Sequence, residues 1–330
     1  MKKKTVRNII LGSVGGAALA TSALYGTANY FFNLAIVRPD KRKQGRNPHN
    51  IVASQAESKD QYGEYTETVA AGKEWLKSQK LETIYTKSFD NLTLAAEILD
   101  VENAVGTVIS VHSFASSPLK DFGNVARFYH EKGYRVVMPY QRANGKSEGQ
   151  YMTYGINECR DVVEWAGVIQ RRFGKDENVF LHGLSMGATS VLMAAGFSEL
   201  PENVRGIIAD SAFISPYRLF RHIVKKDLHL PAFPFLYAME AICNEKAGFG
   251  FSDYSTTEAL DDCTRPVLFI HGEKDGLVPL SMAKENYEIC HTEKELVIIP
   301  GAQHALGYLV DRETCVNAVS SFLDRYTLHI

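Results

Sequence analysis

The feature that most constrains the fold is an alternation, from residue 81 onward, of short apolar runs with longer segments of helical spacing. The runs are rich in β-branched residues, as in VGTVISV at 105–111, which is typical of strands buried on both faces. We expect strands at 92–99 (antiparallel), 105–111, 135–138, 179–181, 204–209, 267–270 and 295–299, with helices at 122–132, 157–173, 186–197, 281–289 and 313–326. This order predicts an α/β fold with a mostly parallel central sheet and helices on both faces.

The turn after the predicted strand at 179–181 contains the motif G-x-S-x-G, with Ser185 at its centre. Such a turn reverses sharply from strand to helix and holds the serine in a strained backbone conformation. Side chains at Gly183 and Gly187 would collide, so glycine is required at both positions. Because a buried strand precedes the motif and an apolar helix follows it, we interpret Ser185 as a nucleophile rather than as part of an ordinary Gly/Ser turn.

A nucleophilic serine needs a base and an acid that orients the base. Asp275 lies just beyond the predicted strand at 267–270, and His304 follows the strand at 295–299. The ends of parallel strands gather at one edge of a sheet, where chemistry is concentrated. The sequence therefore predicts a Ser185, Asp275, His304 triad; Asp210, at the end of the preceding strand, is the alternative acid.

Two backbone N–H donors are expected to stabilise the oxyanion of the reaction. One is the N–H of Met186, directly after the nucleophile, and the other is the N–H of Phe114, in the loop after the strand at 105–111. The alternative for the Phe114 loop is a plain surface connection.

Metal and nucleotide chemistry have no support in the sequence. His112, His182 and His271 each end a strand, but no Asp or Glu accompanies them at metal-ligand spacing. There is no GxGxxG motif and no P-loop lysine. We expect no cofactor and no metal.

The Ser185 turn, the Asp275 turn, residues 112–114, residues 142–147 and residues 301–304 together resemble the α/β-hydrolase superfamily. The branch they resemble is that of serine-aminopeptidase-like, membrane-anchored bacterial serine hydrolases. The resemblance implies the α/β-hydrolase fold, with Ser185 as nucleophile, Asp275 as acid, His304 as base, and Phe114 and Met186 as oxyanion donors. It departs from the family pattern at Ser113, where the family usually has glycine, at 143–144 and at 302–303. The insertion at 211–265 is where these enzymes carry a short lid.

The N-terminus predicts a membrane anchor. No Asp, Glu, Lys or Arg occurs between Arg7 and Arg38, and residues 9–37 exceed the roughly 20 needed to cross hydrocarbon as a helix. A signal peptide cleaved after Ala18-Leu19-Ala20 is the alternative, but apolar residues continue beyond that point. We divide the chain into a basic tail (1–8), a transmembrane anchor (9–37), a polar connector with a short helix at 70–81 (38–80) and a hydrolase domain (81–330).

The location of the main domain is left open by the charges. Four basic residues precede the anchor and five follow it closely, so the positive-inside comparison nearly cancels. We place the chain at the cell membrane as a single-pass protein with an extracytoplasmic main domain. The five cysteines are odd in number and widely spaced, which favours buried free thiols over disulfides or a zinc site.

Charge and motifs together indicate the class of function. Residues 1–46 carry nine Lys/Arg and one Asp, so with an overall charge of −2 the rest of the chain sums to −10, which argues against nucleic acid as a partner. We expect a serine hydrolase that cleaves carboxylic esters through an acyl-enzyme. The alternatives are a serine aminopeptidase or short-peptide hydrolase and, in another class, a non-catalytic membrane-anchored binding scaffold.

Overall fold

A computed structural model describes residues 21–38, 62–229 and 231–328. Within them one sheet has eight strands in the order β1-β2-β4-β3-β5-β6-β7-β8. Their bounds are β1 Leu81–Lys87, β2 Thr93–Leu99, β3 Gly106–Val111, β4 Tyr134–Pro139, β5 Val179–Leu184, β6 Val204–Asp210, β7 Val267–Gly272 and β8 Lys294–Ile299. From β4 to β8 all neighbouring strands are parallel, whereas β2 runs antiparallel to β1 and β4. The predicted α/β class with a mostly parallel sheet is confirmed.

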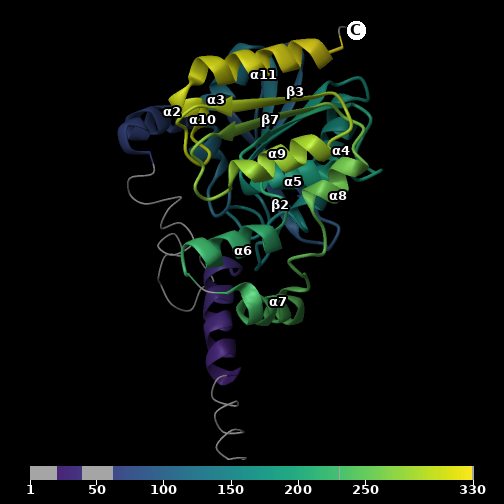
Figure 1. The fold of residues 1–330 in the computed structure, drawn as a ribbon. Helices are drawn as coiled ribbons and strands as arrows, with labels where there is room; N and C mark the ends of the chain where they lie inside the picture. Colours follow the sequence, from purple (N-terminus) through teal and green to yellow (C-terminus); the bar gives the residue numbers. More distant parts are fainter. Residues whose placement is uncertain (1–20, 39–61, 230, 329–330) are drawn as a thin grey trace, which may run out of the picture.

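Helices cover both faces of the sheet (Figure 1). Helices α2 (Thr66–Ser78), α3 (Pro118–Glu131) and α11 (Arg312–Tyr326) share one hydrophobic core with the sheet. On the other face the core contains α4 (Glu158–Phe173), α5 (Met186–Ala194) and part of α9 (Leu280–Ile289). The β-branched residues of β3 are buried on both sides, which explains the uninterrupted apolar run in the sequence.

Most expected elements are present, and the differences have local causes. Helix α3 begins four residues before the expected start because the side chain of Ser117 accepts a hydrogen bond from the Lys120 N–H and Pro118 occupies the first turn. The short helix expected at 70–81 is α2, which begins and ends earlier. Strand β1 was not expected; its largely exposed edge position leaves little apolar signal.

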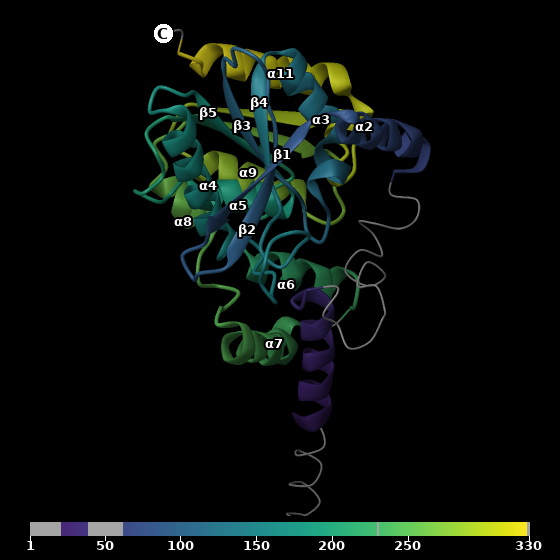
Figure 2. The same ribbon diagram turned by 180° about the vertical axis from the view of Figure 1, so that it is seen from behind.

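The segment 211–265 contains three helices: α6 (Pro216–Lys226), α7 (Ala232–Ala247) and α8 (Thr256–Asp261). Helices α6 and α7 lie at one end of the molecule, away from α11, together with a helix formed by residues 21–35 (Figures 1 and 2). We call residues 21–35 the N-terminal helix.

The last part of the predicted anchor packs against the rest of the chain. Ala28, Phe32 and Ile36 are buried in the core. Val37 forms a β-bridge with Tyr151, and the Met152 N–H donates to the Ile36 carbonyl. No helix among the described residues is long and apolar enough to cross a membrane. Residues 9–20 of the predicted anchor lie outside the described part of the chain, so the anchor stays a prediction.

Candidate active site

Ser185 occupies the sharp turn between β5 and α5. Its backbone has φ 55° and ψ −113°, a region that residues other than glycine rarely adopt. A Cβ atom at Gly183 would overlap the Gly187 carbonyl, and one at Gly187 would overlap the Val111 carbonyl. The two glycines therefore allow the strand to reverse into the helix with Ser185 at the tip, as the motif predicts.

His304 connects Ser185 to Asp275. Its Nε2 lies 2.7 Å from the Ser185 Oγ, and its Nδ1 lies 2.7 Å from the Asp275 Oδ2. All three residues are buried. Because a carboxylate only accepts hydrogen bonds, Nδ1 carries the proton and Nε2 is free to accept the Ser185 proton. The structure thus brings the three predicted residues into one hydrogen-bonded row.

Asp275 is held rigidly in its turn. Its Oδ1 accepts hydrogen bonds from the N–H groups of Leu277 and Val278, at 2.9 and 2.8 Å. Its Oδ2, besides accepting from His304, lies 3.3 Å from Nε2 of His271, which also donates to the Val278 carbonyl. His271 is a contact that the sequence analysis did not predict.

The charges of the row reinforce one another. Burial opposes ionisation of Asp275, but the charge of His304 and its hydrogen bond outweigh this and lower the Asp275 pKa. Burial likewise opposes protonation of His304, yet the charge and hydrogen bond of Asp275, with smaller contributions from Asp210 and Asp121, raise the His304 pKa above its ordinary value. The ion pair formed by protonated His304 and Asp275 is therefore favoured.

Asp210, the alternative acid, has a different role. Its Oδ1 accepts a hydrogen bond from the Ser211 hydroxyl at 2.8 Å, and its backbone carbonyl accepts from the Ser185 N–H. Burial raises the pKa of Asp210 to about 6. Since the carboxylate that hydrogen-bonds His304 is that of Asp275, the geometry favours Asp275 as the orienting acid.

The two predicted oxyanion donors lie on neighbouring segments. Met186 is the first residue of α5, and Phe114 lies in the loop after β3. The Gly187 Cα faces the carbonyls of Val111 and His112, so the first turn of α5 packs directly against the end of β3. The Phe114 ring stacks on Tyr154, with centroids 5.0 Å apart.

Two side chains to which the sequence analysis assigned no role hold the Phe114 loop in place. Asp121, from the first turn of α3, accepts hydrogen bonds from the Ser113 N–H at 2.7 Å and from the Ser116 hydroxyl at 2.5 Å. Asn144 donates to the Ser116 carbonyl at 2.9 Å. The Asp121 contacts span eight and five residues and the Asn144 contact spans 28, and no helix or turn motif in the sequence signals them.

The loop that carries Asn144 is itself fixed by a buried ion pair. Arg142 is 3% exposed and donates two hydrogen bonds of 2.7 Å to Asp161, with a further contact of 2.9 Å to Asp90. The guanidinium therefore ties the loop after β4 to α4 and to the β1–β2 connection.

Replacing Arg142 with alanine is expected to lower the free energy of unfolding by about 3–5 kcal/mol, because the Asp161 carboxylate is left buried without its partner. Urea denaturation measures the change. Arg172→Ala is the matched control: it removes an exposed ion pair, in which one guanidinium nitrogen donates to both carboxylate oxygens of Glu82, and should cost about 0–1 kcal/mol. Equal losses for the two variants would contradict this account.

The three strand-end histidines have separate partners. His112 accepts from the Gln141 N–H and lies 2.7 Å from the Ser113 carbonyl, whereas His182 hydrogen-bonds the Tyr129 hydroxyl at 2.8 Å. His271 faces Asp275. In the part of the chain that the structure describes, no group of three or more His, Cys, Asp or Glu side chains is arranged to hold a metal ion. All five cysteines are free and buried, as expected.

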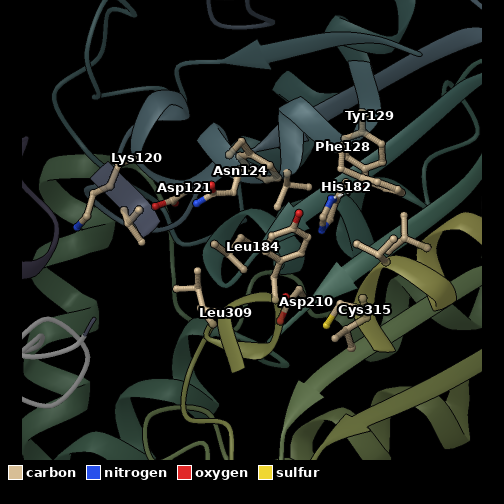
Figure 3. Close-up of a pocket in the computed structure, with 18 of the residues that line it drawn as sticks. Lys120, Asp121, Asn124, Phe128, Tyr129, His182, Leu184, Asp210, Leu309 and Cys315 are labelled. Atoms are coloured by element: carbon tan, nitrogen blue, oxygen red, sulfur yellow. Dashed lines mark hydrogen bonds between the residues drawn. The ribbon is translucent and has the colours of Figure 1, made fainter. Parts of the chain in front are cut away.

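A cavity of about 60 Å³ lies beside the row, between α2, α3 and the residues after β8 (Figure 3). Its lining includes Leu184 and Ala305, which adjoin Ser185 and His304 in the chain, and the carboxyl of Asp210. Figure 3 shows Lys120 at one end, with Tyr129 and His182 at the other. The lining thus includes chain neighbours of both Ser185 and His304 but neither of these two residues.

The family to which the chain belongs is shown by a match of its sequence to a family model. A model of the prolyl oligopeptidase family matches residues 120–329, more than half of the chain. The chain belongs to the prolyl oligopeptidase family. Its α/β-hydrolase membership, expected from the motifs, is confirmed. One relative of the chain is the protein YqkD of Bacillus subtilis (strain 168). The two sequences are 27% identical over 218 residues, and the match covers 66% of this chain and 71% of YqkD.

Solved structures show the same fold as this member of the prolyl oligopeptidase family. The esterase Pf2001 of Pyrococcus furiosus is 24% identical, with a TM-score of 0.61 over 76% of this chain and 94% of that one. The acylaminoacyl peptidase of Pyrococcus horikoshii is 14% identical, with a TM-score of 0.56 over 76% of this chain and 43% of the peptidase. Both likenesses concern the fold.

Proposed function

We propose that this protein is a serine hydrolase that cleaves carboxylic esters through an acyl-enzyme. The single observation that carries the proposal is the hydrogen-bonded row of Ser185, His304 and Asp275, which follow the parallel strands β5, β8 and β7 at the same edge of the sheet. A non-catalytic scaffold, the alternative in another class, has no need of all three groups in this geometry.

The chemistry follows from the row. As the Ser185 Oγ bonds the ester carbonyl carbon, its proton passes to Nε2 of His304, and Asp275 stabilises the imidazolium. The N–H groups of Phe114 and Met186 donate to the oxyanion. His304 then gives the proton to the departing alcohol oxygen as the carbon–oxygen bond breaks. Water attacks the acyl-enzyme by the same route and releases the acid.

The contacts of three acidic residues in the 211–265 segment favour an ester over an amino-acyl substrate. An aminopeptidase needs a carboxylate that holds the substrate ammonium. Glu240 accepts from the Phe251 N–H, Asp253 accepts from the Gly250 N–H, and Glu258 accepts from the Ser255 hydroxyl. These carboxylates serve the local structure of the segment.

Short-peptide hydrolysis remains the second candidate, because the chain belongs to the prolyl oligopeptidase family and an acylaminoacyl peptidase shares its fold. Parallel assays of the purified full chain on p-nitrophenyl acyl esters and on amino-acyl p-nitroanilides separate the two. We expect the larger kcat/KM on the esters, with Ser185→Ala as the background for both. A preference for the anilides would assign the peptidase reaction instead.

The pH dependence of this activity is expected to reflect the raised pKa of His304. His304 acts as a base only when neutral, so kcat/KM should fall as the pH is lowered through a midpoint above 6.5. Asp210→Asn removes a negative charge that favours protonated His304, and should therefore move the midpoint to lower pH. Asp262→Asn, at the exposed end of α8, is the control. A midpoint that Asp210→Asn leaves in place or raises would contradict the assignment.

We further propose that the 211–265 segment acts as a lid. Helix α6 contacts the turn that carries Asp275, through His222 and Lys226 on the Gly276 carbonyl. Phe220 of α6 packs on Tyr154, with centroids 4.8 Å apart, and Tyr154 stacks on Phe114. A movement of α6 would therefore affect both the acid turn and the oxyanion loop.

We also propose that the part of the predicted 9–37 anchor that precedes the buried Ala28 attaches the protein to the cell membrane by a single pass, with the main domain outside the cytoplasm. The uncharged run and its basic flanks support the attachment. Protease added to intact cells tests the orientation: an outward domain is digested, and an inward one is protected. The mass of the N-terminal peptide from the membrane fraction distinguishes an uncleaved anchor from a signal peptide removed after Ala20.

A further inference from the structure

Two aromatic side chains at the start of α7 are turned to solvent. Phe233 is 69% exposed and Tyr237 is 59% exposed, and their rings touch edge to face with centroids 5.5 Å apart. Among the described large hydrophobic side chains, Phe233 is the most exposed. A pair of adjacent exposed aromatic rings marks an interaction surface rather than the scattered apolar residues of an ordinary surface.

The opposite face of α7 is packed against the protein. Phe235, Leu236 and Met239 are buried. Phe235 meets Phe31 of the N-terminal helix edge to face, with centroids 5.3 Å apart, and the Lys246 ammonium donates to the Asn29 side chain at 2.7 Å. Helix α7 is thus fixed to the N-terminal helix, beside which it lies in both views (Figures 1 and 2). The face of α7 that carries Phe233 and Tyr237 is exposed.

The length of the uncharged N-terminal run indicates what covers this face. The run extends from Asn8 to Val37. From Ala28 to Val37 every residue of the run is buried or partly buried in the domain. Residues 8–27 are the uncharged residues that precede Ala28, the first fully buried position of the described N-terminal helix. They number twenty, which is the length needed to cross the hydrocarbon of a bilayer as a helix.

A bilayer crossed by residues 8–27 would have its surface where the N-terminal helix meets the domain. Phe31, which contacts α7, lies four residues beyond Thr27, or about 6 Å along a helix. Tyr25, which is 48% exposed, lies two residues before Thr27. Aromatic side chains gather at this depth, between headgroups and hydrocarbon.

We propose that the outer face of α7, with Phe233 and Tyr237, rests in the headgroup interface of the lipid bilayer that the N-terminal segment crosses. The proposal rests on the proposed membrane attachment and adds a second lipid contact to it. The lid segment would then be held at the membrane surface by its own aromatic residues as well as by the anchor.

Site-directed fluorescence on the full chain tests this contact. Phe233→Cys and Tyr237→Cys are each labelled with an environment-sensitive nitrobenzoxadiazole dye and reconstituted into phosphatidylcholine–phosphatidylglycerol vesicles. Tyr85→Cys is the matched control, because Tyr85 is 60% exposed on edge strand β1. The five native cysteines are buried, and the unsubstituted chain measures their background labelling.

We expect a blue shift and quenching by spin-labelled lipid at positions 233 and 237, with neither at position 85. Water-like emission at 233 and 237 in chains that float with the vesicles would overturn the lipid contact while leaving the anchor intact. Failure of the chain to float would overturn the anchor and the contact together. A blue shift that depends on protein concentration without lipid would assign the face to a second copy of the chain and overturn the proposal.

Discussion

Replacing His304 with alanine is expected to lower kcat on the preferred p-nitrophenyl ester by about four to six orders of magnitude. The loss is large because Ser185 then has no base within reach, and the leaving alcohol has no proton donor. His304 is also the only group that joins Ser185 to Asp275 among the hydrogen bonds of the described residues.

The control for this variant is His291→Ala, which removes a histidine whose side chain is exposed and paired with Asp261 at the surface. It should leave kcat unchanged. Urea denaturation of both variants separates loss of the base from loss of the fold. A folded His304→Ala protein that keeps more than a tenth of the activity would show that another base serves Ser185.

Replacing Asp275 with asparagine is expected to lower kcat by about three to four orders of magnitude, as for the corresponding change in the Ser-His-Asp template. An asparagine amide at this position can donate to Nδ1 of His304, which favours the tautomer with the proton on Nε2. His304 in that tautomer cannot accept the Ser185 proton.

Asp210→Asn is the matched comparison, since Asp210 is the other buried carboxyl at a neighbouring strand end. At the pH optimum it should lower kcat by less than about tenfold, because its hydrogen bond is to Ser211 rather than to His304. If Asp210→Asn costs as much as Asp275→Asn, the orienting acid has been assigned to the wrong carboxylate.

The site residues could be predicted because each depends on a local rule. The turn at Ser185 needs glycine on both sides of the serine, and the overlaps at Gly183 and Gly187 show the steric reason. Asp275 and His304 follow strands whose apolar runs are short and bounded, so their place at the edge of the sheet follows from the parallel topology.

The supporting contacts could not be predicted, because no sequence motif marks the side chains that make them. Asp121 has the pattern of an ordinary acidic residue in the first turn of a helix, yet it holds the loop that carries Phe114. Helices α6 to α8 follow one another between β6 and β7 without a strand between them, so the strand–helix alternation of the rest of the domain does not predict them. Strand β1 is half exposed and pairs only at one edge.

The N-terminal segment shows a further limit of hydropathy. Ala28, Phe32 and Ile36 belong to the apolar run that predicts an anchor, and in the structure they are buried among the protein's own side chains. A protein core and lipid hydrocarbon both favour the same residue types, so composition alone does not mark where one environment ends and the other begins.

The central claim is that Ser185 is an activated nucleophile, and labelling with a fluorophosphonate tests it most directly. The probe bonds covalently to a serine whose proton is taken by a neighbouring base. The account predicts that the intact, folded chain is labelled, that the adduct maps by mass spectrometry to the peptide containing Ser185, and that Ser185→Ala is not labelled. A folded wild-type chain that stays unlabelled, or an adduct on another residue that persists in Ser185→Ala, would contradict it.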